Sequence, residues 1–292
     1  MDILKSLFLG LVQGATEFLP VSSSGHLAVF RHIFHMNLDS GVFFDVMLHF
    51  GTLISLIIVF RQDILSMIRE FFGIIQTAFA NLLVFIKHRN GDTRYTYFKV
   101  VNSSYRKLVL MVLISTVPTG ILGALGSSLV DKASGHLWLV GIFLLITSLL
   151  LFIADRYPKG MTRVKNATYS SAFILGIAQG IATMPGLSRS GTTIATGILL
   201  GYNKKLAVKY SFIMSIPAVI GAIVFEIKDI KTEAFGSAAM PGYLLGTVAA
   251  AITGYFCLKF MLKFIRSRKY IGFSIYCLLM GMLSIGYSIF AR

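Results

Sequence analysis

The stretch LGLVQGATEFLPVSSSGH at residues 9–26 has a diverged second copy, LGIAQGIATMPGLSRSGTT, at residues 175–193. The two align without a gap at an offset of 166 residues, from Leu9 to Leu175. Their identical pairs are mostly Gly, Ser and Gln, whereas chance similarity between two apolar helices would favour Leu, Ile and Val. We therefore predict an internal repeat, with a first unit at about residues 1–62 and a second at about 167–228.

The composition around these copies indicates a membrane protein. Apolar residues make up 55% of the 292-residue chain and charged residues only 13%, about half the charged share of a soluble domain. Apolar runs of the length that spans hydrocarbon as a helix recur through the chain. We predict six spans, near residues 43–60, 108–125, 137–154, 206–225, 243–262 and 271–290.

The second copy predicts a loop that enters the membrane and returns. It lies in mostly apolar sequence between the basic residues Lys165 and Lys204, and PGLSRSGTT interrupts it at its centre. Each arm is too short to span, so we expect two half-helices with a tip at membrane depth. Irregular backbone there must be buried in protein or line a wet cavity. The predicted fold is a single all-α, polytopic membrane domain over residues 1–292, with six spans and two re-entrant hairpins.

The formal net charge of +15 is distributed over short connections and forms no single patch, which argues against nucleic-acid binding. By the positive-inside rule, the basic connections at 87–107, 155–169, 203–209 and 263–269 are cytoplasmic. The orientation of the repeats then depends on residues 64–86. We expect this segment at the cytoplasmic interface, which makes the repeats inverted and places a site near the midplane. If the segment spans instead, the repeats are parallel.

Two of the twelve acidic residues, Glu17 and Asp45, lie inside apolar sequence. An intramembrane carboxylate that faced lipid would cost at least ~2.5 kcal/mol, so it normally faces a cavity or a partner. Glu17 is therefore a functional candidate, with pairing to a basic residue as its structural alternative. Asp45, near the start of its span, fits a structural role equally well. His49 follows Asp45 by one turn and receives no assigned role.

Arg189 lies at the tip of the second copy and predicts an anion site. Its planar guanidinium suits phosphate or carboxylate oxygens and stays charged at physiological pH. Glycines nearby allow close backbone approach, and the helix that begins here directs free N–H groups at the same place. The residues expected to help are Gly186, Ser188, Ser190, Gly191, Thr192 and Thr193.

The first copy adds groups that can react. Pro20 ends a half-helix, Ser22, Ser23 and Ser24 offer hydroxyls at the start of the next, and His26 follows within one turn. A carboxylate base, a hydroxyl or imidazole nucleophile and an Arg clamp are the groups that phosphoryl transfer requires.

At these residues the chain resembles the undecaprenyl-diphosphate phosphatases, also called the bacitracin-resistance family. Gln13, Glu17 and the stretch Pro20 to His26 match its first motif, and Pro185, Gly186, Ser188, Arg189, Ser190 and Thr193 match its second, PGxSRSxxT. The following FDVMLHFGTL also resembles the family, so the likeness covers most of the chain. Residues 64–105 are the least similar part. Many members have Glu where this chain has Gln13, which leaves Glu17 as the sole carboxylate of the first motif.

The resemblance implies a bacterial inner-membrane enzyme that hydrolyses undecaprenyl diphosphate to the monophosphate, recycles the lipid carrier of cell-wall synthesis and gives bacitracin resistance. It also implies dependence on Mg²⁺ or Ca²⁺, with Glu17 as a ligand, and a site that opens toward the outer face. The expected catalytic residues are Glu17, Ser23, His26 and Arg189. The expected substrate-binding residues are Gln13, Ser22, Ser24, Gly186, Ser188, Ser190 and Thr193.

The sequence leaves several alternatives open. Ser23, His26 or a metal-activated water can be the nucleophile. A transporter of a polyprenyl phosphate or another anion also uses inverted repeats, broken helices and an intramembrane Arg and Glu, and a structural or assembly subunit is a third possibility. A transporter has no use for a nucleophile, so SSSGH beside Glu17 favours the enzyme. Prenyl chain length and oligomeric state are not determined by the sequence.

Overall fold

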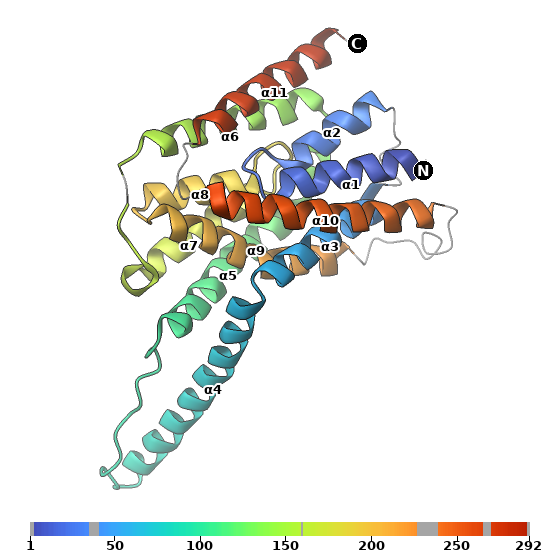
Figure 1. Cartoon of the computed structure of the whole chain (residues 1–292). Helices are drawn as coiled ribbons and strands as arrows, with labels where there is room; N and C mark the ends of the chain where they lie inside the picture. Colours follow the sequence, from blue (N-terminus) through green and yellow to red (C-terminus); the bar gives the residue numbers. More distant parts are fainter. Residues whose placement is uncertain (1–2, 35–40, 159, 227–238, 265–269, 291–292) are drawn as a thin grey trace.

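The computed structural model describes residues 3–34, 41–158, 160–226, 239–264 and 270–290. Within these ranges the named elements are all helices (Figure 1), which confirms the predicted all-α class. They are α1 (Ile3–Glu17), α2 (Ser23–Ile33), α3 (Gly41–Val59), α4 (Arg61–Arg89), α5 (Ser104–Ser134), α6 (Leu137–Arg156), the short 3₁₀ helix η2 (Val164–Asn166), α7 (Tyr169–Ile181), α8 (Arg189–Leu199), α9 (Lys204–Glu226), α10 (Met240–Phe264) and α11 (Ile271–Phe290).

Six helices in the described ranges are long and apolar enough to cross a membrane, the number that the sequence predicts. Five coincide with predicted spans, but the sixth does not. The run at 43–60 lies in α3, a 19-residue apolar helix whose fully described part, Phe43–Val59, counts among the shorter apolar helices, and Arg61–Arg89 is the sixth long one. The remaining spans are Ser104–Val130, Leu137–Arg156, Lys204–Phe225, Met240–Phe264 and Ile271–Phe290.

Glycines allow the body helices to pack backbone against backbone. A Cβ on Gly10 of α1 would lie 2.2 Å from the carbonyl oxygen of Gly246 in α10, and one on Gly51 of α3 would lie 2.4 Å from that of Thr247. The same close approach joins α6 to α11, where a Cβ on Gly141 would lie 2.9 Å from the Gly281 carbonyl oxygen. Small residues are typical of membrane helix interfaces because they increase van der Waals contact where lipid removes the hydrophobic driving force.

The pairs α1–α2 and α7–α8 meet at their turns. The hydroxyl of Ser190 donates to the carbonyl of Leu19 at 3.0 Å, and the amide of Gly186 donates to the hydroxyl of Ser24 at 3.4 Å. The four helices have 11 to 15 residues, about 17 to 23 Å at 1.5 Å per residue, which is shorter than the ~30 Å of hydrocarbon. These lengths agree with the expectation of re-entrant hairpins, whose depth in the membrane stays a prediction.

The two turns also share their capping bonds. Ser22 accepts from the amide of Gly25 at 3.2 Å, and Ser188 accepts from the amide of Gly191 at 3.0 Å. The hydroxyl oxygen of each capping serine lies 3.3 Å from the hydroxyl oxygen of the serine two residues later, Ser24 or Ser190. Both sets of bonds are related by the offset of 166 residues. The internal repeat predicts such a correspondence, while its unit boundaries stay predictions.

The Gly10 contact generates a stability prediction. Gly10→Ala should lower the melting temperature of the detergent-solubilised protein by at least about 4 °C, because the added methyl overlaps a backbone carbonyl and overpacking costs ~1–3 kcal/mol. The matched control is Gly286→Ala in α11, where a Cβ meets no atom within 4 Å. Equal melting temperatures for the two variants would contradict the packing described for α1 and α10.

Candidate active site

Glu17 is the centre of the site. Its side chain, 4% exposed, lies at the end of α1 and uses both carboxylate oxygens. Oε1 forms an ion pair with Arg189 of α8. Oε2 accepts a 2.6 Å hydrogen bond from the hydroxyl of Ser23 and a 2.9 Å bond from the amide of Gln13. The structure therefore brings together four of the predicted residues from both copies of the motif.

Local sequence explains how these groups meet. Gln13 and Glu17 are separated by four residues, so they share one face of α1. The chain then turns, with Pro20 in the turn, and α2 begins at Ser23. Ser22 at the end of this turn has φ 71°, a left-handed conformation that is uncommon for residues other than glycine. Such outliers concentrate at functional sites, where the surrounding structure holds them in place.

His26 is buried beside this turn and both ring nitrogens have partners. Nδ1 lies 2.7 Å from the carbonyl oxygen of Ser22, and Nε2 lies 2.6 Å from the hydroxyl of Tyr276 in α11. A carbonyl can only accept, so Nδ1 carries the proton and Nε2 accepts from Tyr276. The two rings are stacked, with centroids 5.5 Å apart. His26 therefore lies beside the Glu17 cluster with both ring nitrogens held by partners.

The second turn is held mainly by its own hydroxyls. Ser188 caps α8, and its amide donates to the hydroxyl of Thr147 in α6 at 2.9 Å. Gly186 has φ 92°, and a Cβ there would lie 2.3 Å from the Val140 carbonyl oxygen, so only glycine fits. Thr193 contacts Ser211 of α9 at 2.5 Å. Ser188, Ser190 and Thr193, predicted to bind substrate, thus position Arg189 in this structure.

The two turns bring two helix starts to one place. α2 begins at Ser23 and α8 at Arg189, and both residues contact Glu17. Each helix start carries a partial positive charge and free amide groups, which favour an anion. Ser24 is exposed and Arg189 is 23% exposed, so the site is accessible from outside the protein. The arrangement suits a phosphate group.

The oxygen donors around Glu17 fit a divalent cation that also binds a substrate phosphate. Among the described residues, no group of three or more His, Cys, Asp and Glu side chains gathers as a ready metal site. However, Gln13 Oε1 is buried and has no hydrogen-bond partner in the described part of the chain. Mg²⁺ is commonly held by one or two carboxylates, with substrate phosphates and waters completing its shell. Glu17 and Gln13 can supply such a partial set.

The structure also assigns partners to residues whose roles were open or unrecognised. His49 of α3 lies beside Glu17, with its Nδ1 3.9 Å from Oε2 and 3.2 Å from the Gln13 amide nitrogen. Asp45 pairs with Arg31 of α2 instead, which supports its structural interpretation. Tyr276 and Thr147 were missed because a lone aromatic or threonine in an apolar span gives no signal in the sequence.

The fold and site define a polytopic membrane protein with a buried Glu–Ser–Arg cluster at two facing helix starts, suited to binding a phosphorylated compound. Residues 6–283 match the family model described as bacitracin resistance protein BacA. The chain belongs to this family.

Similar proteins cover nearly the whole chain. The undecaprenyl-diphosphatase of Alkaliphilus metalliredigens is 38% identical over 99% of this chain and 100% of its own. The proteins of that name from Methanobrevibacter smithii and Methanosphaera stadtmanae are 39% and 36% identical. They cover 97% and 98% of this chain and 96% and 98% of their own lengths.

The Glu17–Arg189 pair generates a prediction that separates an anion clamp from a structural pair. Arg189→Lys should weaken binding of a prenyl methylenediphosphonate by about tenfold to a hundredfold, because an ammonium lacks two coplanar donors and a lost charge-assisted bond costs ~1.5–3 kcal/mol. Calorimetry measures the affinity. Arg31→Lys, at the ion pair with Asp45, is the matched control and should bind normally.

If Arg189 only balances Glu17, its lysine variant should bind the analogue normally. Arg189→Gln combined with Glu17→Gln should then recover the thermal stability that either single change loses, because a buried charge without its partner costs several kcal/mol. That combination of results would contradict the clamp.

Proposed function

We propose that the protein is a membrane phosphatase that hydrolyses undecaprenyl diphosphate to undecaprenyl phosphate and inorganic phosphate. Such an activity recycles the lipid carrier of peptidoglycan synthesis and gives resistance to bacitracin. The observation that carries the proposal is the Ser23 hydroxyl, 2.6 Å from one oxygen of Glu17 while Arg189 pairs with the other. The Glu17 carboxylate, as the base, thus contacts both the nucleophile Ser23 and the anion clamp Arg189. The names of the similar proteins agree with this chemistry.

Substrate binding begins with an exchange of partners. The diphosphate oxygens compete with Glu17 for Arg189, which is partly exposed and can turn toward an incoming anion. Backbone amides at the starts of α2 and α8 and the exposed hydroxyl of Ser24 add further donors. Once Arg189 has turned to the diphosphate, its ion pair with Glu17 is broken, and the Glu17 carboxylate is free to accept a proton. Charge in the transition state is then stabilised by groups already in place.

The chemical step follows from the same geometry. Ser23 transfers its proton to Glu17 while its oxygen attacks the terminal phosphorus, and the bond from that phosphorus to the bridging oxygen breaks. Undecaprenyl phosphate leaves with the bond's electron pair. Glu17 first passes the Ser23 proton to the leaving phosphate oxygen, then takes a proton from a water that attacks the phosphoserine and returns it to the Ser23 oxygen as inorganic phosphate is released. One water is consumed for each diphosphate hydrolysed.

His26 serves this step by position. Its Nε2, the nitrogen that would attack, already accepts the hydroxyl of Tyr276, and its Nδ1–H donates to the carbonyl of Ser22. The imidazole thereby holds the backbone that precedes Ser23. This arrangement favours Ser23 over His26 among the nucleophiles that the sequence leaves open.

A divalent cation, Mg²⁺ or Ca²⁺, held by Glu17 and the unpartnered oxygen of Gln13 would neutralise charge on the bound diphosphate. Gln13 contributes a neutral ligand in place of a second carboxylate. The site would therefore depend more on the phosphate oxygens of the substrate to complete the shell of the cation.

We place the protein in the bacterial inner membrane, with its site open to the outer face. The end of the α7–α8 pair opposite its turn lies among basic connections. Thr162 and Tyr202 form a backbone bridge there, and Arg163, Lys165 and Lys204 lie close to them in the sequence. Such connections favour the cytoplasm. The α1–α2 pair meets this pair turn to turn, so its base points the opposite way, toward the outside (Figure 1).

The deciding experiment is phosphate release from undecaprenyl diphosphate by the purified protein in detergent. We expect turnover that a chelator suppresses and that Glu17→Gln lowers at least about a thousandfold, since the base and a cation ligand are lost together. The variant should keep its expression level and fold. Binding of the substrate without phosphate release by the unaltered protein would favour the transporter instead.

The contacts of Ser23 and His26 predict different outcomes for nearby variants. Ser23→Ala should abolish turnover, whereas Tyr276→Phe should lower it only about tenfold, because it removes one neutral hydrogen bond worth ~0.5–1.5 kcal/mol. Tyr287→Phe in α11, an exposed tyrosine, is the matched control. A quenched intermediate labelled on the transferred phosphate should resist acid, as phosphoserine does. Acid-labile label, or full activity in Ser23→Ala, would transfer the nucleophile's role to His26 or to water.

A further inference from the structure

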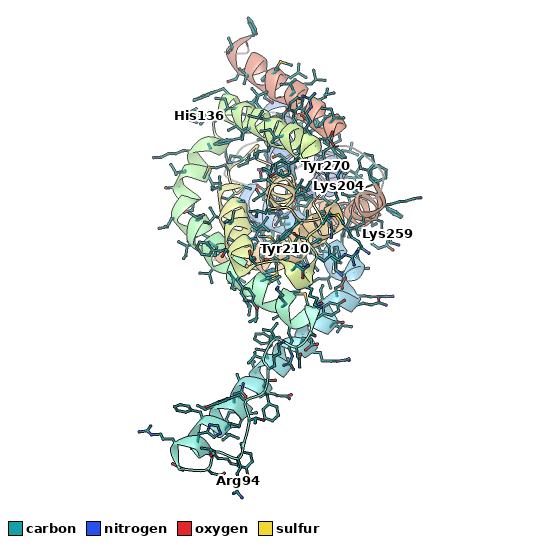
Figure 2. All side chains as sticks on the ribbon, turned by 90° about the vertical axis from the view of Figure 1, so that its left-hand side faces the viewer. Arg94, His136, Lys204, Tyr210, Lys259 and Tyr270 are labelled. Atoms are coloured by element: carbon teal, nitrogen blue, oxygen red, sulfur yellow. The ribbon has the colours of Figure 1, made fainter. Side chains whose placement is uncertain are left out.

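The segment 61–103, here called the arm, lies outside the site and projects from the body (Figure 1). It consists of α4 and an extended return that runs back to α5. Its base is fixed at Asp63, which accepts 2.6 Å hydrogen bonds from Lys209 of α9 and Tyr105 of α5. Only 6% of its apolar window is buried. In Figure 2 the arm extends to one side of the body, so it does not prolong the bundle.

One face of α4 is polar and holds the return. Asn81 bonds both backbone groups of Phe98, at 2.8 and 2.7 Å. Arg106 donates to Glu70 and Thr77, each at 2.9 Å. These contacts give the arm a defined structure and use one side of the helix completely.

The opposite face is an apolar stripe along the whole of α4. At 100° per residue its members fall within about half the helix circumference. A stripe of this size would be an association site or an aggregation hazard in water. Its exposed side chains are Leu65, Ile68, Phe71, Phe72, Ile75, Phe79, Leu82, Leu83, Phe85 and Ile86.

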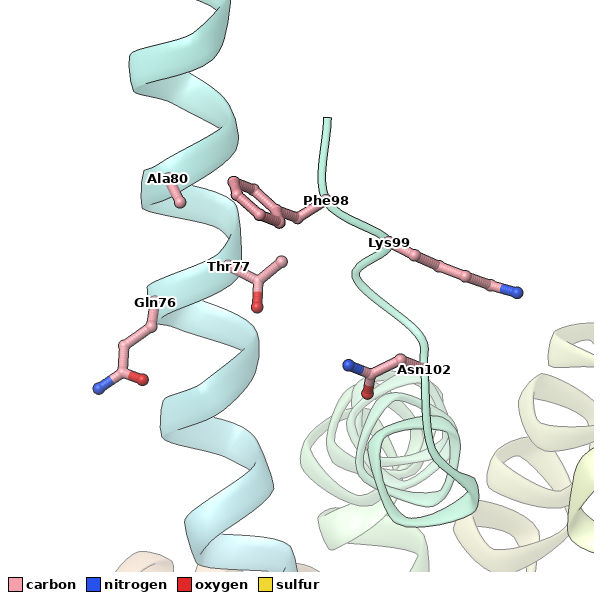
Figure 3. A pocket seen from close by; sticks show the side chains of 6 residues that line it. All are labelled: Gln76, Thr77, Ala80, Phe98, Lys99 and Asn102. Atoms are coloured by element: carbon pink, nitrogen blue, oxygen red, sulfur yellow. The ribbon is translucent and has the colours of Figure 1, made fainter. Parts of the chain in front are cut away.

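A cationic, polar edge borders the stripe. Arg69, Gln76 and Lys87 are exposed and, at 100° per residue, lie within about 20° of one another around the axis. Beside them a groove opens between α4 and the return, lined by Gln76, Thr77, Ala80, Phe98, Lys99 and Asn102. In Figure 3 the Phe98 ring points toward Thr77 and Ala80, and the Lys99 side chain points away from α4, so its cation lies on the outer side of the groove.

The arm has more positive than negative charge. Hydrogen bonds from Arg94 lower the pKa of Asp92 below its ordinary value, so this carboxylate stays charged and pairs with that arginine. Asp63 and Glu70 pair with Lys209 and Arg106. Arg69, Lys87 and Lys99, together with Arg89, add positive charge on exposed positions.

We propose that the arm is an in-plane membrane element that binds anionic phospholipid. The stripe lies among acyl chains, while Arg69, Lys87 and the groove with Lys99 bind phosphate headgroups at the edge. An apolar face with cationic residues along its border is the pattern of helices that lie in the bilayer interface. The base of the arm meets α9 near the basic connection 203–209, at the cytoplasmic leaflet, whose anionic lipids attract such residues.

The alternatives, a second copy of the chain or another protein, fit these charges less well. Protein interfaces are enriched in aromatic residues and depleted of lysine relative to the rest of the surface. Here exposed Arg69 and Lys87 border the apolar stripe, and Lys99 lies beside it on the return. The proposal is independent of the proposed phosphatase activity, because it concerns residues remote from Glu17.

The sole tryptophan, Trp138, makes a direct test possible. In a Trp138→Phe background, Phe79→Trp reports on the arm and Leu149→Trp on a lipid-facing position of α6. Both are reconstituted into phosphatidylcholine vesicles with about 20 mol% phosphatidylglycerol, a proportion that gives an anionic surface. Bromine is carried either by the neutral or by the anionic lipid, and quenching is compared.

We expect Phe79→Trp to be quenched by both lipids, with quenching by brominated phosphatidylglycerol at least twice its mole share. For Leu149→Trp, quenching by brominated phosphatidylglycerol should equal the mole share of that lipid. Arg69→Gln, Lys87→Gln and Lys99→Gln together should return the arm to the mole share, whereas Arg163→Gln, Lys204→Gln and Lys205→Gln, a matched set outside the arm, should not. If Phe79→Trp is not quenched, the stripe contacts protein or water instead of acyl chains. If the triple Gln variant of the arm keeps the excess quenching by brominated phosphatidylglycerol, the three cations do not form a headgroup site. Either result overturns the proposal.

Discussion

The ion pair between Glu17 and Arg189 is the constraint on which the rest of the structure depends. A carboxylate in apolar surroundings needs a cation and hydrogen-bond donors, and its partner here is 172 residues away in the chain. To bring them together, two helix turns must face each other, both helices that follow must start at the same place, and the backbone must take a left-handed conformation at Ser22 and Gly186. The same arrangement directs two helix starts at the space a phosphate would fill.

Close helix packing provides the frame for this meeting. Gly10, Gly51 and Gly246 allow α1 and α3 to approach α10 at backbone distance, while Gly141 and Gly281 do the same for α6 and α11. α11 then carries Tyr276 to His26, and α6 carries Thr147 to Ser188. The site is therefore supported from both sides by helices that hold few of the motif residues. A shift of one of these pairs would move a partner of the site, because cores of this density transmit strain.

The arm follows a different logic from the body. Its polar groups bond to the return and to the adjoining ends of α5 and α9, as Asn81 does to Phe98 and Asp63 to Lys209, so its apolar residues face outward. In the body, by contrast, apolar clusters are buried between helices, and a polar cluster surrounds Glu17. The chain thus combines the site for which we propose a lipid diphosphate substrate with a peripheral element that has the character of a lipid-contacting helix.

Sequence alone determined the all-α membrane class and predicted the residues that the structure gathers around Glu17, because polar side chains within apolar sequence have few explanations. Glu17, Ser23 and Arg189 were identified in this way, and Gln13 by its place in the repeated motif. Only the tertiary structure decided that His49 lies beside Glu17 while Asp45 pairs with Arg31, that Tyr276 binds His26 across 250 residues, and that α4 projects from the body with few buried residues. Periodicity and composition describe what each segment can bury, but which segments meet depends on packing between residues far apart in the chain.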